Sequence, residues 1–152
     1  MALTPTSYGD NPFQPGVFAE TYLPDQLIAG NEHLVTETQT LALQVAVLAR
    51  GTLVGKVTAT GDLTVCVKTA ADGSQTPYGI LVDQTDATAG AVSCGVYIKG
   101  EFNVNKMTID ASWGASVGAQ FAALQDPARA VQLYLKQPID ANDPTEVNAA
   151  GV

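Results

Sequence analysis

Turn signals recur at short intervals through the middle of this chain and leave room only for short extended segments between them. The signals contain Gly, Asp, Ser or Pro and fall at residues 50–51, 60–62, 70–77 and 83–91. The segments between them are rich in Val, Ile, Leu and Thr, which favour strands. The expected strands are residues 33–43, 52–59, 62–68, 78–82 and 92–98. The second and third of these are expected to pair as a hairpin.

The last third of the chain holds the one segment with a helical pattern. Small and apolar residues recur across residues 111–124 and predict the only helix, although Gly114 and Gly118 weaken it. Residues 130–135 are expected to form a final strand. The fold class predicted from these elements is mainly β: a small single domain of short antiparallel strands with at most one or two short helices.

Prolines and aromatic residues are interleaved through the first 24 residues. Proline removes a backbone donor and pushes the preceding residue towards extended geometry, so we expect an extended N-terminal arm. A wholly disordered tail usually has few aromatic residues, so we expect the arm to dock. It either wraps its own domain or becomes ordered on a partner, and the sequence favours neither. The candidate binding residues are Pro12, Phe13, Pro15, Phe18 and Tyr22.

The predicted organisation has three parts: the arm at residues 1–24, a β-rich domain at 25–136 and a polar C-terminal tail at 137–152. A chain of 152 residues can bury one hydrophobic core. Charged residues make up only 14% of it, below the roughly 25% that is typical of soluble domains. The surface is therefore expected to be rich in small uncharged residues, which suits broad protein contacts.

The charge balance argues against a nucleic-acid partner. The formal net charge is -8, and the seven Lys and Arg residues are spread singly along the chain, whereas phosphate binding needs several on one face. No run approaches the ~18 apolar residues that a membrane span needs, and the N-terminus lacks the pattern of a signal peptide. We expect no membrane partner and a protein that is made and used in the cytoplasm.

Residues suited to catalysis or metal binding are sparse. His33 is the only histidine and lies in a polar context, so we expect it to be solvated. Cys66 and Cys94 lie in apolar strand-like runs without metal-ligand spacing, and we expect two buried thiols. Residues 72–74, Asp-Gly-Ser, are expected to form a turn. The prediction is a protein that is not an enzyme, with no cofactor and no metal.

Three runs in this order carry a resemblance to a known family. They are ARGTLVGKV at 49–57, AADGSQTPYGILVD at 70–83 and VYIKGEFN at 96–103. The chain resembles the head decoration proteins of tailed bacteriophages, the lambda gpD-like family, from about Gly30 to Leu135. It departs from that pattern in its longer chain and extra polar tail.

The resemblance implies a β-tulip or barrel-like domain that forms a homotrimer and binds the major capsid protein. Such a protein is made in the host cytoplasm and sits on the exterior of the expanded head. There it cements the capsid against the internal pressure of the DNA. The acidic balance agrees with an exterior position, because packaged DNA would repel the protein.

Two other functions remain open at this point. One is a host- or glycan-binding module on the virion surface, with Trp113 stacking on a sugar, although a lone Trp is more often a core or subunit-contact residue. The other is an uncharacterised hydrolase, which these residues do not favour.

Overall fold

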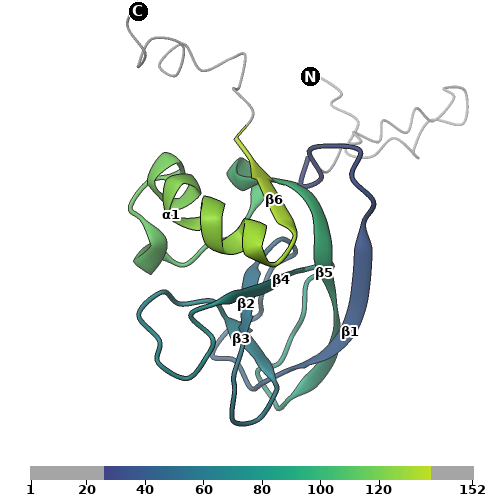
Figure 1. The fold of residues 1–152 in the computed structure, drawn as a ribbon. Coiled ribbons are helices and arrows are strands. Elements are labelled where there is room, and N and C mark those ends of the chain that lie inside the picture. The colour runs from purple at the N-terminus through teal and green to yellow at the C-terminus, as the bar shows by residue number, and fades with distance from the viewer. Residues whose placement is uncertain (1–25, 138–152) are drawn as a thin grey trace, which may run out of the picture.

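The computed structural model describes residues 26–137, so the expected arm at 1–24 and nearly all of the expected tail lie outside the described residues. Strands are the main regular structure, as predicted (Figure 1). The strands are β1 (Val35–Leu41), β2 (Leu53–Lys56), β3 (Leu63–Val65), β4 (Pro77–Leu81), β5 (Val92–Asn103) and β6 (Leu133–Lys136). The helical segments are the 3-10 turns η1 (Val104–Lys106) and η2 (Ala111–Trp113) and the α-helix α1 (Val117–Ala130).

Five strands close into a barrel in the order β1-β3-β2-β4-β5, because β5 also pairs with β1. The predicted hairpin is confirmed, since β2 and β3 pair antiparallel with Val54 opposite Val65. Two pairings are parallel, β1 with β3 and β5 with β6, and at these two places the sheet departs from the expected antiparallel pairing. Parallel neighbours need a long crossover, and η1, η2 and α1 together supply the one between β5 and β6.

Successive residues along the strands divide between two cores. In β4, Ile80 belongs to one core and Leu81 to the other, and in β5 Tyr97 and Val96 divide in the same way. One core fills the barrel, and the other lies between the barrel wall and α1, where Leu124 is fully buried. Side chains alternate across a strand. The unbroken apolar run of β4 is therefore a strand that is covered on both faces.

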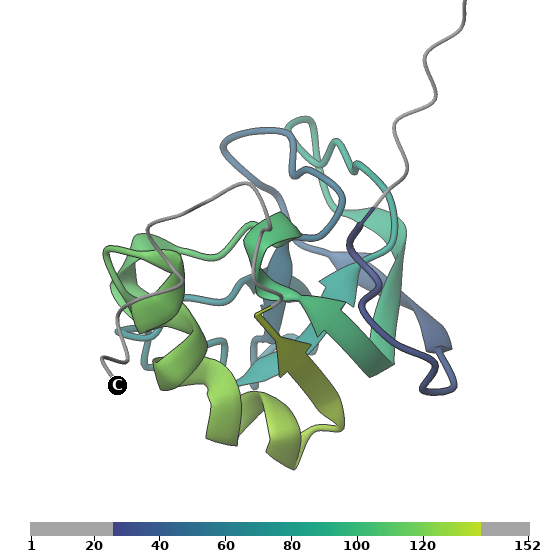
Figure 2. The ribbon, with the colours of Figure 1, turned by 90° about the horizontal axis from the view of Figure 1, so that it is seen from above.

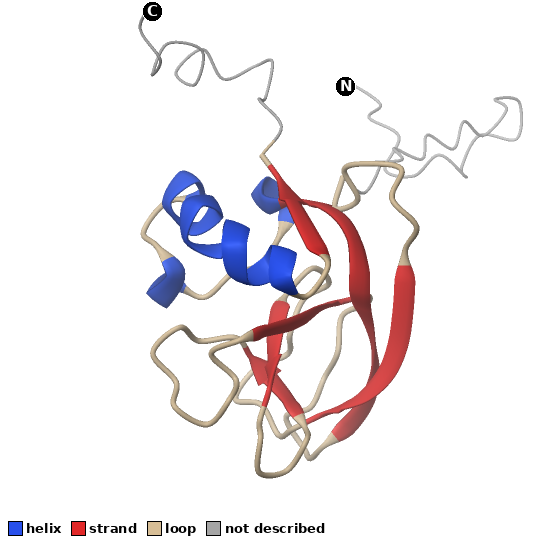
Figure 3. Cartoon of the chain, in the orientation of Figure 1, coloured by secondary structure: helices blue, strands red, loops and turns tan. Residues whose placement is uncertain are grey.

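Within residues 26–137 the α-helix lies further along the chain than its pattern predicted. The prediction of 111–124 spans two elements, because the chain makes the short turn η2 and then restarts at α1 (Figure 3). The Ser116 side chain accepts a hydrogen bond from the Ala119 N–H at 3.3 Å and caps α1. The helix continues past Pro127 to Ala130, anchored by the buried Leu124 and Ala128. The last strand therefore begins at Leu133, three residues after the predicted start at 130.

The helix and β1 lie on opposite sides of the molecule. Seen from above in Figure 2, α1 packs beside β6, and β1 lies beyond β5. The strand β5 has different neighbours along its length. Its first part, up to Lys99, pairs with β1, and its last part, from Gly100, pairs with β6.

Candidate interaction site

The described chain begins and ends at the same place, beside the last residues of β5. The Asn103 N–H donates to the carbonyl oxygen of Leu27 at 2.8 Å, and the Ala29 N–H donates to that of Glu101 at 3.0 Å. On the other flank Lys136 lies opposite Asn103. Leu27 is 1% exposed and packs in the core with Phe102, so the segment that follows the expected arm is firmly anchored.

The Glu101 side chain contacts both of the segments that flank the end of β5. Its carboxylate forms an ion pair with Lys136 at 2.8 Å and accepts hydrogen bonds from the backbone N–H groups of Asn31 and Glu32. The hydrogen bond from Lys136 is the main reason that the pKa of Glu101 lies below its ordinary value. A side chain at Gly30 would overlap this carboxylate, so it would displace Glu101 from its present position. One side chain thereby connects β5, β6 and the entry of the chain.

A second feature of the surface is a segment of exposed apolar side chains that follows β1. Leu43, Val45 and Val47 are 64%, 103% and 43% exposed. No charged residue lies between Thr38 and Ala49. This agrees with the expected weakly charged surface, and such segments often lie at protein contacts.

The predicted binding residues Pro12, Phe13, Pro15, Phe18 and Tyr22 all lie outside the described residues. They stay a prediction. The sequence analysis did not predict the contact between Glu101 and Gly30 next to the arm, although Glu101 lies within the VYIKGEFN run at 96–103. A Gly-to-Glu contact across 71 positions leaves no local signal.

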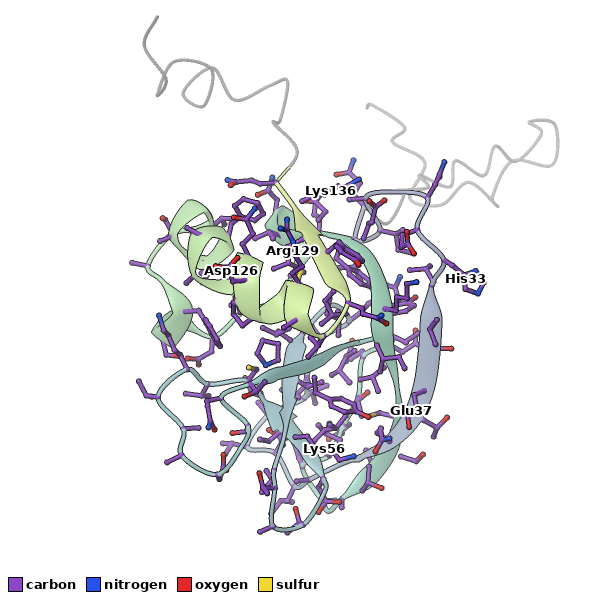
Figure 4. The ribbon with its side chains drawn as sticks, in the orientation of Figure 1. His33, Glu37, Lys56, Asp126, Arg129 and Lys136 are labelled. Carbon is purple, nitrogen blue, oxygen red and sulfur yellow. The ribbon has the colours of Figure 1, made fainter. Side chains whose placement is uncertain are left out.

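The residues considered for chemistry are placed much as expected. His33 is exposed and projects from the margin of the molecule beside β1 (Figure 4). The carboxylate of Asp72 accepts hydrogen bonds from the N–H and the hydroxyl of Ser74, at 3.0 Å and 2.6 Å, so residues 72–74 form the predicted turn. These bonds also lower the pKa of Asp72. Ser74 is 2% exposed, and its hydroxyl is engaged by the Asp72 carboxylate of its own turn.

The cysteines and the tryptophan are interior residues. Cys66 and Cys94 are buried free thiols, as predicted. Trp113 is 6% exposed and is a core residue, with the Lys68 ammonium 5.6 Å from its ring centre. A sugar needs an exposed ring face to stack on, so Trp113 does not support the glycan-binding alternative.

Residues 26–137 contain neither a cluster of metal ligands nor a helix suited to a membrane. No group of three or more His, Cys, Asp and Glu side chains in this part of the chain is arranged to hold a metal ion. No helix there has the length and apolar character needed to cross a membrane.

The family model described as bacteriophage lambda head decoration protein D matches residues 19–129, well over half of the 152 residues. A comparison with curated proteins found no match. The family match includes Phe102, Glu101, Trp113 and most of α1, and it begins within the expected arm, before Tyr22.

Proposed function

This chain belongs to the family of bacteriophage lambda head decoration protein D, and from this premise we propose that it is a cement protein of a phage head. Membership makes it a structural component of the virion that binds the capsid. The finer proposal is that it binds the major capsid protein on the exterior of the expanded head as a homotrimer. In that position it opposes the pressure of the packaged DNA.

The observation that carries this proposal is the family match over residues 19–129, which joins the end of the arm to the whole barrel. The anchored segment at Leu27–Ala29 supports a role for the arm, because force on the arm would be transmitted directly into β5. The net charge of -8 supports the exterior position, because an acidic protein is repelled by DNA.

We propose that the arm makes the main contact with the shell. It adds an extended strand to an exposed sheet of the capsid, with Phe13, Phe18 and Tyr22 filling neighbouring pockets. Three arms on one trimer act at a high effective concentration, so modest individual contacts produce a tight complex.

Stabilisation of the head then follows from linkage. A protein that binds only the expanded shell lowers the free energy of that state relative to the unexpanded and the ruptured states. The size of the effect depends on the free protein concentration relative to its dissociation constant.

The test uses the full chain and expanded shells that lack decoration. Co-sedimentation at a saturating, symmetric stoichiometry supports the cement role, and light scattering gives the mass of the free protein. Deletion of residues 2–20 should leave the fold and the trimer intact and abolish capsid binding. The triple variant Phe13→Ser, Phe18→Ser and Tyr22→Ser keeps every proline and should also lose binding. A full chain that binds no form of the shell overturns the proposal.

A further inference from the structure

β1 is paired on only one side along most of its length. It pairs with β5 from Val35 to Leu41, but it meets β3 at Leu41 alone. Within residues 26–137 no other strand pairs with the remaining edge. In Figure 1 this edge forms the margin of the molecule opposite α1.

The direction of the backbone groups on this edge follows from one hydrogen bond. The Ala42 N–H points away from β5, because it donates to the carbonyl oxygen of Leu63 in β3 at 2.8 Å. Backbone groups alternate in direction along a strand. The N–H and C=O groups of Thr36 and Thr38 therefore also point away from β5, and no described residue pairs with them.

From Thr36 to Leu41 this edge has little of the usual protection against strand addition. Exposed edges are normally blocked by proline, by charged side chains or by a bulge. The irregularity in the β1–β5 register lies before Thr36, so the strand is regular from Thr36 to Leu41. The one charged side chain here, Glu37, accepts hydrogen bonds from Gln39 at 2.7 Å and from the Tyr78 hydroxyl at 3.0 Å. Glu37 is thereby held towards β4.

The position of the edge favours the shell as its partner. Ile28 pairs with Phe102 on the same flank of β5 as β1, so the segment that follows the arm and the edge of β1 lie in one line. The proposed arm therefore joins the domain close to this edge, and a shell segment bound by the arm would lie near the start of β1. A second copy is a poorer partner, because β1-to-β1 pairing is a two-fold contact and produces dimers, whereas the proposed assembly has three-fold symmetry.

We propose that the outer edge of β1 is a second capsid contact, at which an extended, uncharged segment of the shell subunit adds as a strand and pairs with Thr36 and Thr38. This inference rests on the proposed function and adds to the arm a contact made by the folded domain. The paired segment ends near Thr40, because β3 occupies the edge from Leu41 onward.

Amide hydrogen exchange on the unaltered full chain is the first test. The N–H groups of Thr36 and Thr38 should exchange freely in the free protein and at least about tenfold more slowly on decorated shells. Equal exchange in both states overturns the inference. Slow exchange of these N–H groups already in the free protein also overturns the inference. If light scattering then shows a trimer, a neighbouring copy covers the edge. If it shows a monomer, the chain's own arm covers it.

A matched pair of variants is the second test. Thr38→Pro removes the outward N–H, which β5 does not use, while Thr38→Val keeps the N–H and, like the proline variant, removes the side-chain hydroxyl. Thr38→Pro should weaken shell binding at least about tenfold, and Thr38→Val should bind normally. Circular dichroism must show both variants folded. Normal shell binding by a folded Thr38→Pro variant overturns the β1-edge contact but not the proposed cement function. A wild-type chain that binds no shell overturns both the edge contact and the cement function.

Discussion

The indole nitrogen of Trp113 donates a hydrogen bond at 3.0 Å to the backbone carbonyl oxygen of Cys66, across 47 positions of sequence. Both residues are in the core, 6% and 0% exposed. This bond fastens η2 to the segment after β3, and it holds the C-terminal third of the chain against the barrel. A second bond nearby, from the Lys68 N–H to the Ser112 hydroxyl at 2.9 Å, joins the same two segments.

Trp113→Phe should destabilise the fold by about 1–3 kcal/mol, because the Cys66 carbonyl would be left buried without its partner. Urea denaturation followed by circular dichroism measures the change. Tyr134→Phe is the control, since Tyr134 is 37% exposed, and its free energy of unfolding should stay within about 0.5 kcal/mol of wild type. Equal stability of the two variants would show that the indole bond contributes nothing.

Neither cysteine should react with thiol reagents in the folded protein. Burial raises the pKa of the Cys66 thiol to about 12 and also raises that of Cys94, so the reactive thiolate is scarce near neutral pH. Labelling by an aromatic disulfide reagent at about pH 8 should be slow for the native chain and complete in denaturant. Rapid labelling without denaturant would contradict the burial of these groups.

Gly55→Ala should destabilise the protein by about 2 kcal/mol or more, because the new methyl group would overlap the Ser74 carbonyl oxygen. That atom belongs to the backbone of the Asp72–Ser74 turn and has little freedom to move. Gly90→Ala is the matched control, since nothing lies within 4 Å of its added carbon. Thermal unfolding compares the two, and a Gly55→Ala protein as stable as Gly90→Ala would show that the turn can shift.

The Glu101 ion pair should make stability depend on pH in the acid range. The folded-state pKa of Glu101 is lowered from 4.5, so its contribution is present above that value and is lost as the pH falls through the folded pKa. The melting temperature of Glu101→Gln should therefore be below that of wild type at about pH 7, and the gap should close on acidification. Lys136→Gln should show a similar trend. A gap that widens below pH 4 would reverse the assigned sign.

The strands and the hairpin could be predicted because their signals are local. Gly61 and Asp62 end one strand and start another within a few residues, and the pattern of β4 depends only on its own side chains. The helix was misplaced because Gly114 interrupts the predicted segment instead of only weakening it, and because the helix continues through Pro127. The chain breaks at the glycine, which lies before the Ser116 cap, and it tolerates the proline, because core contacts hold the final turn.

The candidate site divides in a similar way. The aromatic and proline-rich composition of the arm identified Phe13, Phe18 and Tyr22 from the sequence, and these remain predictions outside the described residues. The anchor formed by Gly30, Glu101 and Lys136 joins three distant positions, so it was missed.

The sequence by itself determined a mainly β domain with buried thiols, a weakly charged surface and an acidic balance, because these depend on local pattern and composition. Only the tertiary structure decided that β5 closes the barrel on β1, and that the edge at Thr36 and Thr38 stays unpaired. The threonines of β1 alternate as they would in any exposed strand. Which side of a strand finds a partner depends on hydrogen bonds between segments far apart in the chain, and local pattern carries no record of them.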